Sequence, residues 1–109
     1  MLQQEQRQDI LILRPSGRLD SASAPELERV VVEHLDSGTR RLVFDFSDLD
    51  YISSAGLRVV LLAGKRLRAE GGKMQLAVMR DTVRDVFEMS GFIQLFPVAS
   101  TLDEGLAQV

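Results

Sequence analysis

Within the stretch Leu42–Leu62, LVFDFSDLDYISSAGLRVVLL, a strand pattern changes to a helix pattern. Residues 40–46, RRLVFDF, alternate between an apolar face that carries both phenylalanines and a second face, as a β-strand does. From Leu57 onward, apolar residues recur at the spacing of one face of a helix. Two serines, an alanine and a glycine fill the junction at 53–56. The stretch therefore predicts a strand, a turn at 47–56 and a helix.

The same alternation continues along the chain in both directions. Strands are predicted at 10–13, 73–79 and 94–98, and further helices at 23–37, 81–90 and 100–109. Strands that alternate with helices indicate an α/β fold, here one domain over 1–109 with a small, mixed, mostly parallel sheet and about four helices. Residues 1–8 are expected to be flexible or to form a short edge strand.

Several residues predict where the helices begin and end. Ser23 and Glu26 have the spacing of a capping box, in which each side chain accepts a hydrogen bond from a backbone amide of the other residue. Ser53 is a natural N-cap for the helix that follows it. The remaining start and stop signals are Asp81, Ser100 or Thr101 as caps and Gly38, Gly71 and Gly91 as ends.

The composition excludes several classes of protein. The 109 residues include no cysteine, so disulfides, thiol nucleophiles and thiolate metal sites are excluded. The formal net charge of −3 argues against nonspecific nucleic-acid binding. The polar start and the longest apolar run, Val59–Ala63, argue against a signal peptide and a membrane span, so a cytoplasmic protein is expected. A monomer is expected because no apolar helix stripe is left over.

The small residues of the junction suggest a role beyond capping. One cap does not need Ser53, Ser54, Ala55 and Gly56 together, and Gly56 removes a Cβ that would crowd a group approaching from outside. Helix amides and the positive end of the helix dipole favour an anion at such a turn. Two anions remain open, namely a bound ligand phosphate and a phosphorylated serine.

A catalytic role for the serines is a weaker interpretation. A hydrolase nucleophile elbow centred on Ser54 would need glycine where the chain has Ile52. The only histidine, His34, lies within or beside the apolar stripe of the first helix and is a poor candidate for a general base. A single histidine makes a metal site improbable. Asp45, Asp48 and Asp50 could be read as a cation cluster, although Asp48 and Asp50 fit turn positions better. We therefore expect no enzyme and no cofactor.

Three segments in this order resemble the STAS domains, and among them the bacterial anti-sigma factor antagonists. They are GRLD at 17–20, the stretch 42–62 and FEMSG at 87–91. The resemblance implies the STAS fold and a phosphoacceptor serine two places before the Gly-Leu pair, which is Ser54, with Ser53 as second choice. Many members carry an aspartate before the acceptor and Ser or Thr after it, whereas this chain has Ser53 and Ala55.

The resemblance also implies a function, partner switching. The unmodified domain would bind an anti-sigma factor that is also a serine kinase and so free the sigma factor. Phosphorylation would break that complex, and a PP2C-type phosphatase would restore it. Two alternatives stay open: a STAS subunit of a lipid transporter or stress assembly without a phospho-switch, and a small serine hydrolase. The partner-binding residues implied or suggested at this turn are Asp20, Ser21, Ser53, Ser54, Ala55, Gly56 and Arg58.

Overall fold

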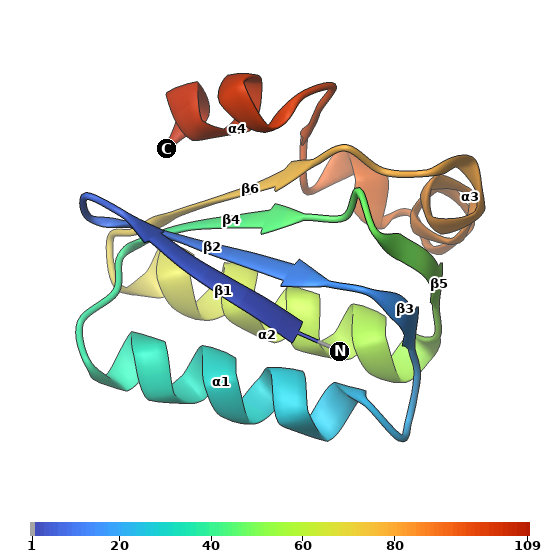
Figure 1. The fold of residues 1–109 in the computed structure, drawn as a ribbon, viewed down its shortest axis with the longest axis horizontal. Coiled ribbons are helices and arrows are strands. Elements are labelled where there is room, and N and C mark those ends of the chain that lie inside the picture. The colour runs from blue at the N-terminus through green and yellow to red at the C-terminus, as the bar shows by residue number, and fades with distance from the viewer. Residues whose placement is uncertain (1) are drawn as a thin grey trace.

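The computed structural model describes residues 2–109 and contains one main sheet with helices on both faces (Figure 1). The sheet has five strands in the order β1-β2-β4-β6-β7. Only the β1–β2 pair is antiparallel, and the other neighbours are parallel, so the predicted mixed, mostly parallel sheet is confirmed. The strands are β1 Leu2–Arg7, β2 Ile10–Pro15, β4 Arg41–Asp45, β6 Lys73–Ala77 and β7 Val98–Ala99.

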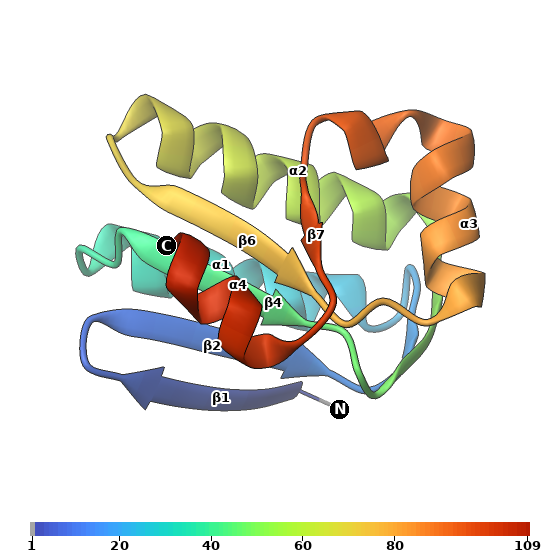
Figure 2. The same cartoon turned by 90° about the horizontal axis from the view of Figure 1, so that it is seen from above.

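Residues 2–109 contain four α-helices, as the sequence predicts, and three of them cover the main sheet. Figure 1 shows α1 (Ala24–Asp36) and α2 (Ser54–Ala69) on one face and α4 (Leu102–Gln108) on the other. The helix α3 (Asp81–Ser90) and the 3₁₀ turn η1 (Phe92–Gln94) lie at one end of the molecule, which Figure 2 shows from above. Because the strands that lead into them, β3 (Gly17–Leu19) and β5 (Leu49–Ile52), are parallel, α1 and α2 begin at the same end of the sheet.

The alternation seen in the sequence divides the core into two apolar clusters. On the α1/α2 side, Leu42 and Phe44 pack with both helices. On the α4 side, Val43 joins Ile10 and Ile12 beneath Leu106 and its neighbours. Each fully buried side chain of this kind contributes about 1.5–3 kcal/mol of transfer free energy, so the strand pattern fixes which face each helix covers.

A second, two-stranded sheet was not predicted. It consists of β3 (Gly17–Leu19) and β5 (Leu49–Ile52), which pair in parallel beside the main sheet. The predicted turn at 47–56 therefore contains a strand. Its two inner residues, Leu49 and Ile52, are buried, whereas Asp50 and Tyr51 between them are exposed. Such a short strand surrounded by aspartates carries too few apolar residues for its pattern to stand out.

Several boundaries also differ from the prediction. The strand predicted at 10–13 continues to Pro15, and the last strand is Val98–Ala99 instead of 94–98, because residues 92–94 form η1. The strand predicted at 73–79 ends at Ala77, since Val78 has a left-handed φ of 61° and packs with the α4 cluster. At α3 the N-cap position is Arg80, and Asp81 is the first helical residue.

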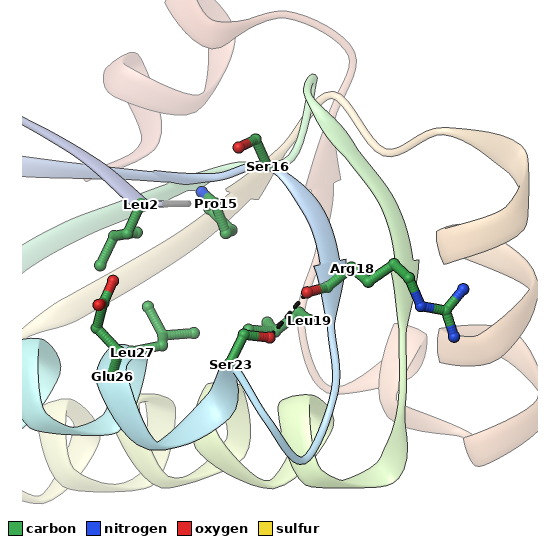
Figure 3. Close-up of a pocket in the computed structure, with 8 residues that line it drawn as sticks. All are labelled: Leu2, Pro15, Ser16, Arg18, Leu19, Ser23, Glu26 and Leu27. Carbon is green, nitrogen blue, oxygen red and sulfur yellow. Dashed lines mark hydrogen bonds between the residues drawn. The ribbon is translucent and has the colours of Figure 1, made fainter.

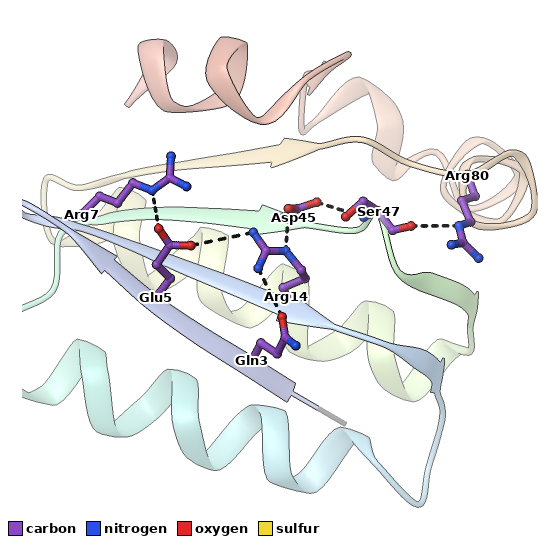
Figure 4. Close-up of polar contacts among 7 residues, drawn as sticks. All are labelled: Gln3, Glu5, Arg7, Arg14, Asp45, Ser47 and Arg80. Atoms are coloured by element: carbon purple, nitrogen blue, oxygen red, sulfur yellow. Dashed lines mark hydrogen bonds and ion pairs between the residues drawn. The ribbon is translucent and has the colours of Figure 1, made fainter.

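A polar network crosses the face of the sheet beside α4. Arg14 of β2 donates from Nε to Asp45 Oδ2 of β4 at 2.8 Å, and Ser47 N donates to Asp45 Oδ1 (Figure 4). Arg14 also contacts Gln3 and Glu5 of the edge strand β1. Asp45 is thus part of a structural ion pair. Among residues 2–109, no three His, Asp or Glu side chains are grouped to hold a metal ion.

Candidate functional site

The β3–β5 ribbon brings two turns to one end of the molecule. Because the two strands are parallel, β3 leads into the turn at 20–23 at the same end at which β5 leads into α2. A hydrogen bond from Ser53 N to Leu19 O, 2.9 Å long, ties the two turns together. The predicted site residues 20–21 and 53–55 are therefore neighbours, although about thirty positions separate them in sequence.

The first turn is held by Asp20. Its Oδ1 accepts hydrogen bonds from Ala22 N at 3.0 Å and Ser23 N at 3.3 Å. The hydrogen bond from Ala22 N, with further ones from Ser23 and the charge of Arg18, outweighs the small desolvation of the carboxylate and lowers the pKa of Asp20. Asp20 is thus an ionised turn residue, and Ser21 beside it is exposed.

The predicted capping box at α1 is wrong. Ser23 lies at the N-cap position, but its Oγ donates to Arg18 O at 2.8 Å and accepts from Asp20 N at 3.0 Å (Figure 3). Ser23 therefore braces the turn against β3 and does not cap the helix. Glu26 points instead into a small cleft between α1 and the start of β3, which Leu2, Pro15 and Leu27 also line.

The two serines of the second turn differ sharply in exposure. Ser53 is the N-cap residue of α2 by position, with φ −96° and ψ 177°, yet its side chain caps no amide. Its Oγ is buried and has no hydrogen-bond partner within residues 2–109. Ser54 is the first residue of α2 and is exposed. A large reagent approaching from solvent thus meets Ser54, whereas the Ser53 hydroxyl faces inward.

Gly56 does not leave space for an outside group, and that prediction is wrong. The residue is buried, and a Cβ added to it would lie 2.8 Å from Leu19 Cγ and from Ile52 Cγ1 and 2.9 Å from Leu19 O. Glycine is required because α2 packs directly on the β3–β5 ribbon at this point. Gly56 therefore lets α2 pack closely against the β3–β5 ribbon, and it is not part of the exposed surface of the turn. Ala55 is half-buried and packs against the core.

Arg58 lies one turn further along α2 and bridges to α1. Its Nη2 donates to Glu28 Oε1 at 2.8 Å, and the two side chains are 64% and 35% exposed. Arg66 makes a similar bridge to Asp36 near the opposite ends of the two helices. The pair α1/α2 is therefore linked by an exposed arginine–carboxylate contact at each end.

Two neighbouring residues were missed from the sequence. Arg18 and Tyr51 are register partners in the β3–β5 ribbon, and the Arg18 guanidinium carbon lies 4.2 Å from the centre of the Tyr51 ring. Both side chains are exposed, whereas the next residue of each strand, Leu19 or Ile52, is buried. Their pairing could have been found only if β3 and β5 had both been recognised as strands.

The only histidine of the chain, His34, lies away from the serine turn. His34 bonds to Gln4 Oε1 through Nε2 and lies ten positions beyond Ala24, the start of α1, so it is roughly 15 Å along the helix from the site. Asp50, which was considered as part of a cation cluster, is paired with Arg80. Ser54 is therefore not paired with His34 in the way that the serine of a Ser–His hydrolase is. Among residues 2–109, no helix is both long enough and apolar enough to cross a bilayer.

Comparisons with known proteins agree with this architecture. The family model of the STAS domain matches residues 1–105. A candidate anti-sigma factor antagonist from Bordetella bronchiseptica, BtrV, is 47% identical over 98 residues, which cover 90% of this chain and 84% of BtrV.

Solved structures show the same fold. A candidate anti-sigma factor antagonist from Thermotoga maritima has a TM-score of 0.94 at 22% identity, covering 99% of this chain and 93% of the other. The Bacillus cell fate determinant SpoIIAA in its phosphorylated form has a TM-score of 0.79 at 23% identity, covering 99% and 98%. The chain therefore belongs to the STAS domain family.

Proposed function

We propose that this protein is an anti-sigma factor antagonist whose binding is switched by phosphorylation of Ser54. The single observation that carries the proposal is the exposed hydroxyl of Ser54 at the start of α2, in a STAS chain 47% identical to BtrV. The names of more distant relatives, an anti-sigma F factor antagonist from Paenibacillus polymyxa and an anti-sigma-B factor antagonist from Staphylococcus aureus, support the same role.

Ser54 is a better acceptor than Ser53. A kinase must bring the γ-phosphoryl group in line with a free hydroxyl, and the buried Ser53 Oγ leaves no room for that approach. Ser54 also lies in the first turn of a sixteen-residue helix, where negative charge is favoured by about 0.3–1 kcal/mol at exposed positions. Modification is thus compatible with the folded domain.

The switch acts on the docking surface, which consists of the turn at 20–22, residues 53–55 and the exposed side of α2 with Arg58. Phosphorylation adds a charge of about −1.5 to −2 and three acceptor oxygens at its centre. A partner fitted to a serine hydroxyl would have to accommodate a hydrated dianion for which the partner itself provides no cation. A loss of about 3 kcal/mol, which weakens binding more than a hundredfold, is within the usual range for such a mismatch.

The partners follow from this cycle. An anti-sigma factor with serine kinase activity binds the unmodified domain and phosphorylates it, and a phosphatase of the PP2C type removes the phosphate. The domain itself supplies the hydroxyl and the docking surface, and needs no catalytic group or cofactor. A STAS subunit of a lipid transporter or stress assembly would use the same surface without modification, and the experiment below separates the two.

The test is a comparison of wild type with Ser54→Ala, Ser53→Ala and Ser54→Asp. The binding partner is captured from the native cell on the wild-type protein, identified, and purified. With this partner and ATP, intact mass should show one added phosphate on wild type and Ser53→Ala and none on Ser54→Ala. Ser54→Asp should bind the partner less tightly than Ser54→Ala. Labelling of Ser54→Ala at full yield, or equal affinities, would contradict the proposal.

A further inference from the structure

The contact between Arg58 and Glu28 lies beside the proposed phosphorylation site. Ser54 and Arg58 are separated by four positions on α2, so they occupy the same face of the helix, one turn apart. Helical side chains tilt toward the N-terminus, and an arginine covers the turn that precedes its own Cα. For Arg58, this preceding turn is the one that contains Ser54.

In the unmodified protein the Arg58 guanidinium is paired with a carboxylate of α1. It donates from Nη2 to Glu28 Oε1 at 2.8 Å, across the gap between the two helices. Both side chains are substantially exposed, 64% and 35%, and an exposed ion pair of this kind is weak because water screens it. Little stability is lost when Arg58 leaves Glu28, so a stronger acceptor nearby can take it over.

We propose that Arg58 binds the phosphate of phosphorylated Ser54 and releases Glu28. The inference rests on the proposed function, because it needs a phosphate on Ser54. A phosphate dianion attracts the guanidinium more strongly than a single carboxylate, and its oxygens can accept two parallel hydrogen bonds from the arginine fork. Because Ser54 lies one turn before Arg58 on α2, its phosphate would be within reach of the arginine without a change in the helix backbone.

The exchange carries the signal from α2 to α1. In the unmodified state Arg58 neutralises Glu28, and the two side chains bridge the helices. After phosphorylation the phosphate is partly neutralised by Arg58, while Glu28 on α1 becomes an unpaired carboxylate. The negative charge that a partner meets is therefore spread over both helices. Arg58 acts as the phosphate-binding residue of the modification site and as the link to α1.

The test uses phosphoserine placed at position 54 by reassigning its codon, so no kinase is required. A ³¹P NMR titration measures the second pKa of this phosphoserine, which is about 6 for an unpaired group. Arg58→Met should raise that pKa by about 0.2–0.7 relative to wild type, the range expected for losing one exposed ion pair. Glu28→Gln should leave it equal or lower, because Arg58 then has no competing carboxylate.

Arg66→Met is the matched control, since Arg66 bridges α1 and α2 at the opposite end of the helix pair. It should leave the pKa of phosphoserine 54 unchanged. As a second readout, the Arg58 Nε–H proton should move downfield when phosphoserine is present, whereas that of Arg66 should not. The proposal is overturned if Arg58→Met leaves the pKa unchanged, if Arg66→Met shifts it equally, or if the Arg58 signal does not move. Because the phosphate is installed directly, these outcomes are independent of whether a kinase modifies Ser54.

Discussion

Arg14 and Asp45 face each other across neighbouring parallel strands, with Arg14 Nε 2.8 Å from Asp45 Oδ2. The Asp45 side chain is only 5% exposed. Burial disfavours its charged form, but hydrogen bonds from Arg14 and from the backbone of Ser47 outweigh that cost, and the pKa of Asp45 lies below its ordinary value of 3.8. The pair therefore makes the fold sensitive to acid.

We expect Asp45→Asn to lower the free energy of unfolding by about 1–3 kcal/mol at pH 7, because Arg14 loses its charged partner. The pKa of the Asp45 carboxylate is lower in the folded protein than its unfolded value of 3.8. Its contribution to the free energy of unfolding is therefore complete above pH 3.8 and is lost as the pH falls through the folded pKa. Urea denaturation from pH 7 to pH 2.5 should thus show the gap between variant and wild type closing below about pH 4.

Asp9→Asn serves as the control for this acid effect. Asp9 also contacts an arginine, Arg41, but its side chain is 68% exposed, so the substitution should change stability little at any pH. A gap between Asp45→Asn and wild type that stays constant down to pH 2.5 would contradict the assignment to the Asp45 carboxylate.

Gly56→Ala should destabilise the domain although alanine is the better helix former. The new Cβ would overlap Leu19 and Ile52, and the backbone oxygen of Leu19 cannot rotate away. Overpacking of this kind costs about 1–3 kcal/mol, so a net loss of up to about 2 kcal/mol remains after the gain of about 1 kcal/mol in helix propensity. The change is measured as a shift of the urea midpoint.

Gly64→Ala gives a comparison within the same helix. Its Cβ would meet the ring of Phe96, a half-buried side chain that can move, and the terminal methyl of Met74. We expect a smaller loss than at Gly56. Equal losses at the two positions would argue against a rigid contact between α2 and the β3–β5 ribbon.

Ser53→Ala should be nearly neutral, within about 0.5 kcal/mol of wild type, which is unusual for a serine at an N-cap position. The Ser53 hydroxyl caps no amide and is buried without a partner, so its removal also removes a desolvation cost. Thr101→Ala is the matched positive control, because Thr101 Oγ1 accepts from Glu104 N at 3.1 Å and should cost about 1 kcal/mol. If Ser53→Ala costs as much as Thr101→Ala, Ser53 caps α2 in solution.

Phosphoserine at position 54 should leave the domain folded, with a melting temperature within about 4 °C of wild type, because the site is exposed at a helix N-terminus. Phosphoserine at position 53 should instead cost about 3 kcal/mol or more, since its oxygen is buried. Calorimetry of the two singly modified proteins measures the contrast. Similar melting temperatures for both would mean that the turn opens readily.

The elements that the sequence predicted are those whose apolar pattern is long. The strand around Phe44 and the helix around Leu57 show clear periods and were both predicted, although α2 already begins at Ser54, within the predicted turn. β5 has only two buried residues, Leu49 and Ile52, and it is stabilised by pairing with β3, about thirty positions away. Contacts at that separation leave no local signal.

The residues of the proposed site lie together in the structure, but their individual contacts were not predicted. Residue type suggested that Ser53 caps α2 and that Gly56 leaves an opening, because serine and glycine commonly do so. Which way a hydroxyl points, and which neighbour a missing Cβ accommodates, depend on packing against Leu19 and Ile52 from a different part of the chain. Glu28 was missed for the same reason, since its contact with Arg58 joins two separate helices.

The parallel ribbon of β3 and β5 carries the proposed docking surface outside the main sheet. The turn at 20–22 and residues 53–55 both emerge from it, while most of the apolar core lies beneath the five-stranded sheet. If the proposed docking surface is correct, the two turns should be exchangeable as a pair between STAS domains without a change in the five-stranded sheet. Grafting both segments together should transfer the choice of binding partner, whereas grafting either one alone should give a docking surface that binds neither partner tightly.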